Sequence, residues 1–213
     1  MLTFPVTLFG GGPARIDFAS NTSDSTDATS YSFSMGAGTV TDDRYIIVGV
    51  SVVALGADTT TLPTVTINGN ATTAITTDAF LKFVGLSVPA VTSITVGITR
   101  GGNQMSSASA VVYAAYNLTS TTAAATVSTG GGSNPQVGSV NTNLGDCIVG
   151  MGFSNGAASF TWSGLTEDVD SSPAGVLSHT SAHQNAVASG TPYVVDVTRS
   201  AGAVGGIITA SFR

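Results

Sequence analysis

Short runs of β-branched and small apolar residues, separated by clusters of Gly, Ser, Asn and Asp, recur along this chain of 213 residues. Val, Ile and Thr fit the pleated surface of a strand, whereas Gly, Asn and Asp favour turns. Helix-forming side chains are scarce, since the chain holds one Glu and one Lys. Short strands between turns are typical of a β-sandwich or barrel, and they predict an all-β fold.

Two segments carry the clearest strand patterns. Residues 45–54 are apolar or small at nearly every position, so both faces of this strand are expected to be covered. Asn68-Gly69 stands between two extended runs and predicts a hairpin, because both turn residues must accept a positive φ. Further strands are predicted at residues 79–88, 93–100, 108–116, 147–153, 159–162, 166–169, 176–181, 193–199 and 205–212. Roughly a dozen strands predict a sandwich of two sheets packed face to face.

Two stretches interrupt this pattern. Residues 1–29 combine an apolar start with a Gly-rich hinge and a polar tract, which predicts either an arm that docks on a neighbour or a first strand plus a loop. Residues 119–134 are small and polar; a loop within one domain is favoured there, with a domain boundary as the alternative. We therefore predict an N-terminal extension, residues 1–29, followed by one sandwich domain, residues 30–213.

Charge and composition exclude several classes of protein. Charged residues make up 8% of the chain, against about 25% in an average soluble domain. The net charge of -6 is opposite to that of a nucleic-acid-binding surface, and no apolar run is long enough to cross a membrane. The start lacks a basic region and is not expected to act as a signal peptide. Cys147 is the single cysteine and lies in an apolar run, so we expect a buried structural thiol.

Residues suited to catalysis or metal binding are few. His179 and His183 would lie on one face of a strand, roughly 13 Å apart, which is too far for two ligands of one metal. The acidic run Glu167, Asp168 and Asp170 lacks a full calcium-loop pattern and is expected to be a solvated turn, with a glycosidase pair as a weaker alternative. No Gly-x-Ser-x-Gly motif occurs. We predict a non-enzymatic protein with no catalytic residue, no cofactor and no metal.

Several strand motifs resemble those of jelly-roll-type β-sandwich structural proteins of tailed bacteriophages. They are YSFSM at residues 31–35, TDDRYIIVGVS at 41–51, PTVTINGNAT at 63–72, VVYAAYNL at 111–118, FTWSGLTED at 160–168, VTRS at 197–200 and ASFR at 210–213. The resemblance covers about residues 30–213, and it implies a virion component without an active site. Residues 1–29 lie outside it, which suits a docking arm specific to one particle.

The resemblance leaves the virion component open. A capsid decoration or cement protein is favoured, packing on the major capsid protein through sheet edges and the arm; low charge and uncovered edges also favour a homo-oligomer, with a trimer preferred. Expected interaction residues are Phe4, Val6, Leu8, Phe9 and Arg15.

The alternative is a tail fibre, spike or head-fibre module that binds host glycans. Its candidate contacts are Tyr113, Tyr116 and Trp162, although core packing is favoured for Trp162. A glycan-cleaving enzyme is disfavoured, because carboxylate, His and Lys side chains are scarce.

Overall fold

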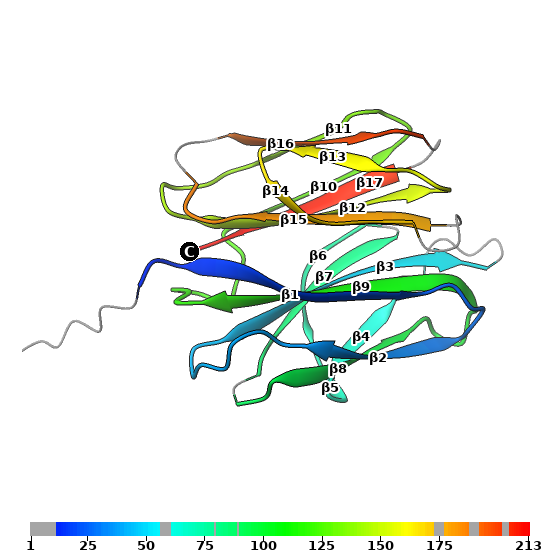
Figure 1. Ribbon diagram of the computed structural model, residues 1–213, viewed down its shortest axis with the longest axis horizontal. Helices are drawn as coiled ribbons and strands as arrows, with labels where there is room; N and C mark the ends of the chain where they lie inside the picture. Colours follow the sequence, from blue (N-terminus) through cyan, green and yellow to red (C-terminus); the bar gives the residue numbers. More distant parts are fainter. Residues whose placement is uncertain are drawn as a thin grey trace, which may run out of the picture.

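The computed structural model describes residues 12–55, 61–78, 80–88, 90–172, 177–187, 192–201 and 205–213. Within these ranges the chain forms seventeen strands in four antiparallel sheets and no helix. The sheets stack as four layers (Figure 1). The predicted all-β class and sandwich architecture are confirmed, but the described residues build four sheets where the sequence predicted two.

The first sandwich holds the N-terminal half of the chain. Its inner sheet has the order β1 (Arg15–Asp24), β9 (Met105–Tyr116), β3 (Tyr45–Ala54), β7 (Leu81–Ser87) and β6 (Thr73–Thr77). Its outer sheet has the order β2 (Ser30–Gly36), β8 (Ser93–Thr99), β4 (Thr64–Ile67) and β5 (Asn70–Ala71). Alternating side chains of the outer strands enter an apolar core shared with β3 and β9.

The second sandwich holds the C-terminal half. Its inner sheet has the order β10 (Ala125–Gly131), β17 (Gly205–Phe212), β12 (Cys147–Asn155), β15 (Leu177–Gln184) and β14 (Thr166–Ser171). Its outer sheet has the order β11 (Gln136–Val140), β16 (Tyr193–Arg199) and β13 (Phe160–Ser163). Trp162 and Phe160 fill the core between these two sheets.

The two sandwiches repeat one topology. The inner order β1-β9-β3-β7-β6 corresponds strand by strand to β10-β17-β12-β15-β14, and the outer order β2-β8-β4 corresponds to β11-β16-β13. A trace survives in the sequence. The end of β8 and the residue after it read VGITR at residues 96–100, and the end of β16 reads VDVTR at residues 195–199. The chain crosses from the first half to the second within residues 119–134, where the sequence favoured a loop. Part of this stretch, residues 125–131, forms strand β10 instead.

A third core joins the two halves. The inner sheets face each other with opposite strand order, so that β1 lies against β12 and β15 while β6 lies against β10 and β17. This central layer contains Phe83 and Val111 from the first sandwich and Met151 and Phe153 from the second. Gly49 of β3 permits the close approach, since a Cβ there would lie 2.6 Å from Phe83 and 2.9 Å from Met151 Sδ.

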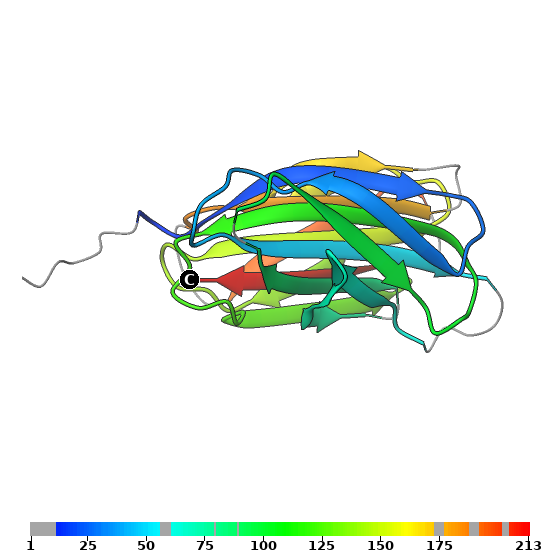
Figure 2. The same ribbon diagram turned by 90° about the horizontal axis from the view of Figure 1, so that it is seen from below.

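Several local predictions can be compared with the structure. β3 spans residues 45–54 as predicted, and the hairpin turn at Asn68 and Gly69 has φ angles of 52° and 76°. Of the two alternatives for the N-terminal extension, residues 15–24 form a first strand, β1, which pairs with β9 in the inner sheet of the first sandwich. Figure 2 shows the molecule from the side of the outer sheet of that sandwich, with the strands of the inner sheet behind it. Residues 1–11 lie outside the described residues. Within the ranges above, no helix is long and apolar enough to cross a membrane.

Candidate functional site

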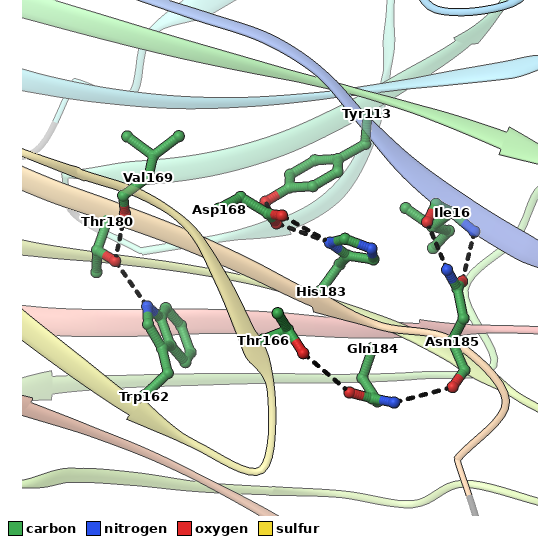
Figure 3. Close-up of polar contacts among 10 residues, drawn as sticks. All are labelled: Ile16, Tyr113, Trp162, Thr166, Asp168, Val169, Thr180, His183, Gln184 and Asn185. Carbon is green, nitrogen blue, oxygen red and sulfur yellow. Dashed lines mark hydrogen bonds and ion pairs between the residues drawn. The ribbon is translucent and has the colours of Figure 1, made fainter.

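Three polar side chains meet at the edge of the central layer where β1, β14 and β15 come together (Figure 3). The Tyr113 hydroxyl of β9 donates to Asp168 Oδ2 of β14 at 2.9 Å, and His183 Nδ1 of β15 lies 2.8 Å from the same oxygen. Tyr113 is fully buried and the Asp168 side chain is 9% exposed. Burial, reinforced by the Asp168 carboxylate, raises the pKa of Tyr113 well above its usual value. This cluster ties the first sandwich to the second.

The position of Asp168 corrects the expectation of a solvated acidic turn. Residues 166–171 form strand β14, and a register shift between Glu167 and Val169 places a bulge at Asp168. Bulges re-aim side chains, and here the bulge coincides with a carboxylate turned toward the central layer. Asp170 is also engaged, because its carboxylate accepts a hydrogen bond from the Phe160 backbone N–H at 3.1 Å. Burial and the neighbouring carboxylates raise the pKa of Glu167.

Next to this cluster, Asn185 fastens β1 to the second sandwich. Its side-chain oxygen accepts from the Ile16 N–H at 2.6 Å, and its amide donates to the Ile16 carbonyl at 2.8 Å (Figure 3). The Cys147 thiol lies 3.0 Å from the Ala14 carbonyl and is fully buried, as the sequence predicts for a structural thiol. These contacts close this edge of the junction along the start of β1.

His179 and His183 lie on the same strand, β15, but differ in surroundings. His183 pairs with Asp168, whereas His179 is fully buried and neither of its ring nitrogens has a hydrogen-bond partner among the described residues. Burial lowers the pKa of His179 to about 4, so the ring is neutral at pH 7. In the part of the chain that the structure describes, no group of three or more His, Cys, Asp and Glu side chains could hold a metal ion.

The three aromatic residues considered for glycan contact are all buried. Tyr113 is fully buried, Tyr116 is 2% exposed and Trp162 is 9% exposed. Tyr116 donates to the Thr39 carbonyl at 2.9 Å, and Trp162 Nε1 donates to Thr180 Oγ1 at 2.6 Å. In this structure none of them presents an open ring face to a sugar, and Trp162 packs in the core as the sequence favours.

The expected interaction residues fall into two groups. Phe4, Val6, Leu8 and Phe9 lie outside the described residues. Arg15 opens β1 with a half-exposed side chain, 3.4 Å from Asp17, and its guanidinium carbon lies 4.7 Å from the centre of the Tyr116 ring.

Sequence reasoning missed three buried arginines. Arg44, Arg100 and Arg199 are 1–3% exposed, and each donates to backbone carbonyls. Arg44 alone reaches the carbonyls of Ala37, Val88 and Val91 and so holds the loops around β3 together. With three of six Lys and Arg side chains buried, the exposed surface is more acidic than the net charge of -6 suggests.

The outward faces of the two outer sheets carry little charge. Outward positions of β2, β8 and β4 are Ser30, Ser32, Ser34, Thr64, Thr66, Ser93, Thr95 and Thr99, together with glycines. Those of β11, β16 and β13 are Val137, Ser139, Thr161, Ser163, Val194, Asp196 and Thr198. Val137 and Val194 are each 51% exposed, which is high for β-branched aliphatic side chains on a sheet.

A groove opens at the opposite edge of the junction, beside β6 and the start of β10. Its volume is about 450 Å³, and residues of β6, β7 and the segment 121–126 line it together with Tyr45. Because Asp78 accepts a hydrogen bond from Ser128 at 3.3 Å, the edges of the two sandwiches also touch further along β10.

Among known proteins, no family model and no curated sequence matches this chain.

Proposed function

We propose that the protein is a non-enzymatic structural component of a tailed-phage virion, a capsid decoration or cement protein that packs on the major capsid protein. The observation that carries this proposal is the pair of nearly uncharged outer sheet faces, one of which exposes Val137 and Val194. Such faces can be covered by another protein with little desolvation of charge.

The internal organisation supports a structural role. Three apolar cores stack on one another in the described residues. The polar side chains Tyr113, Asp168 and His183 contact one another across the junction. The placement of β1-β9-β3-β7 opposite β2-β8-β4-β5 supports the jelly-roll type that the resemblance implies. A homotrimer remains the preferred oligomer, and the acidic surface favours a partner with basic side chains around an apolar centre.

Copy number in purified virions is the primary test. Quantitative mass spectrometry should find the protein in numbers comparable with the major shell protein. A small number would favour the alternative, a tail fibre, spike or head-fibre module that binds host glycans. Complete absence from particles would contradict any virion role.

Paired variants of the two outer faces locate the docking surface. Val137→Asp with Val194→Asp adds charge to the face proposed to pack on the shell, and should abolish incorporation into particles. Thr95→Asp adds charge to the opposite outer face and should leave incorporation unchanged. Circular dichroism must show native folding for each variant; equal incorporation of both would refute this docking face.

The arm is tested by deleting residues 1–11. The deletion stops before Arg15, because β1 belongs to the inner sheet and pairs with β9. The shortened chain should fold as the full chain does and fail to join particles. Normal incorporation would remove the arm, and with it Phe4, Val6, Leu8 and Phe9, from the docking model.

A further inference from the structure

We propose that the groove beside β6 and β10 is a binding site for a neutral saccharide, independent of any assembly into a particle. The groove lies where the two sandwiches meet, and junctions between packed units are common places for ligand sites. Its volume of about 450 Å³ falls in the range of small-molecule pockets.

The chemistry of the lining indicates the class of ligand. Six hydroxyl side chains border the groove: Tyr45, Thr73, Ser87, Thr121, Thr122 and Thr126. Ile75, Leu86 and Ala123 add apolar surface between them. The described lining has no charged side chain, so it offers no counter-charge to an anion or a cation. Hydroxyls beside small apolar patches match a sugar ring, which has hydroxyls at its edge and C–H groups on its faces.

Tyr45 supplies a fixed polar group in the groove. The residue is only 5% exposed, and its hydroxyl has no hydrogen-bond partner among the described residues. Its ring lies across Gly85, because a Cβ on that glycine would lie only 2.0 Å from the Tyr45 hydroxyl oxygen. Burial raises the pKa of Tyr45, which keeps the hydroxyl protonated and able to donate. The hydroxyl borders the open groove, so its donor and acceptor positions are available to a sugar oxygen there.

Other hydroxyls of the lining are open to a ligand. Thr73, Ser87, Thr121, Thr122 and Thr126 are exposed, so their side chains can exchange water for sugar hydroxyls. They come from β6, β7, β10 and the segment between the two halves, and with Tyr45 they line one groove. Several hydroxyl groups that border one groove give the directional contacts that orient a sugar ring.

Saturation-transfer NMR of the full chain tests the proposal, with glucose, galactose, mannose and N-acetylglucosamine as probes at up to about 10 mM, a concentration suited to weak binding. At least one of these sugars should receive saturation, and N-acetylneuraminic acid, which is anionic, should receive less. Tyr45→Phe and Thr126→Val should each weaken the binding of that sugar by roughly tenfold, because each removes a single hydroxyl.

The matched control is Thr95→Val, which removes an exposed threonine hydroxyl from the outer face of β8. It should bind the sugar as the unaltered chain does, and all three variants should keep the native melting temperature to within a few degrees. The proposal is overturned if none of the four neutral sugars receives saturation. It is equally overturned if Tyr45→Phe and Thr126→Val bind as tightly as Thr95→Val. Neither result bears on copy number in virions, so the two proposals fail separately.

Discussion

The two edges of the junction between the sandwiches have equivalent backbone plans and different side chains. The halves repeat one topology and stack with opposite strand order. As a result, β1 contacts β15 at one edge, and β10, which corresponds to β1 in the second half, contacts β6 at the other edge. Asn185 and the Asp168 cluster close the first edge with hydrogen bonds. At the second edge Asp78 contacts Ser128, and next to this contact the groove remains open.

Because the two halves of the repeat have diverged in sequence, the two edges of the junction can serve different roles. If the two edges of the junction were identical, each would have to hold the sandwiches together and bind a ligand. Because the hydrogen bonds at the closed edge already stabilise the junction, the residues at the open edge can change without loss of the fold. The comparison predicts large stability effects at the closed edge and small ones at the open edge.

Removing the central carboxylate should have the largest effect. Asp168→Ala leaves the buried Tyr113 hydroxyl and the His183 ring without their partner, and should lower the free energy of unfolding by about 3 kcal/mol. Asp78→Ala, the same change at the open edge, should lower it by less than about 1 kcal/mol. Urea denaturation of both variants measures the difference, and equal losses would contradict the comparison.

Acid should weaken the central layer through His179. An ordinary histidine in the unfolded chain titrates near pH 6.5, whereas the folded pKa is about 4. Between these values the unfolded chain binds a proton that the folded chain does not, so stability falls as the pH falls from about 6.5 to about 4. The loss should reach about 3 kcal/mol at 1.36 kcal/mol per pKa unit.

His179→Leu isolates that contribution. The leucine cannot bind a proton, so the fall in stability between pH 7 and pH 4.5 should shrink by roughly 2 kcal/mol relative to the unaltered chain. His183→Leu serves as the comparison on the same strand. Urea denaturation at the two pH values measures both, and an unchanged pH dependence in His179→Leu would show that the imidazole is not the responsible group.

Asn185→Ala should have the next largest effect. The change removes two hydrogen bonds to the Ile16 backbone and should cost about 2 kcal/mol, because Ile16 is fully buried and its backbone N–H and carbonyl would lose these partners. Hydrogen exchange at the start of β1 should accelerate at the same time. Gln184→Ala removes the neighbouring amide, serves as the control and should cost less than about 0.5 kcal/mol. If the amides of β1 stayed protected from exchange in Asn185→Ala, other contacts would be holding β1 to the second sandwich.

Much of the fold could be predicted from local pattern. The run at residues 45–54 and the Asn68-Gly69 hairpin follow from side-chain type and turn geometry, which act over a few residues. The tandem repeat was missed, because the halves share little sequence beyond the strand ends at residues 96–100 and 195–199. β10 was missed because it is an edge strand whose exposed positions are polar or glycine, so its composition matches a loop.

The candidate sites depend on contacts between distant parts of the chain. Tyr113 and Asp168 are 55 residues apart and meet only because the two inner sheets stack. The groove collects threonines from three segments, and threonine is too common in this chain for any one of them to stand out. The acidic run itself was visible, but the inward turn of Asp168 depends on a bulge that no local pattern marks.

The open edge should show the smallest effect on stability. Thr126→Val keeps the shape of an exposed, β-branched side chain on β10 and removes only its hydroxyl, so the free energy of unfolding should change by less than about 0.5 kcal/mol. The same substitution should weaken saccharide binding, which separates ligand contact from folding at one residue. A loss of stability near that of Asn185→Ala would mean that both edges hold the sandwiches together, and the functional contrast between them would then disappear.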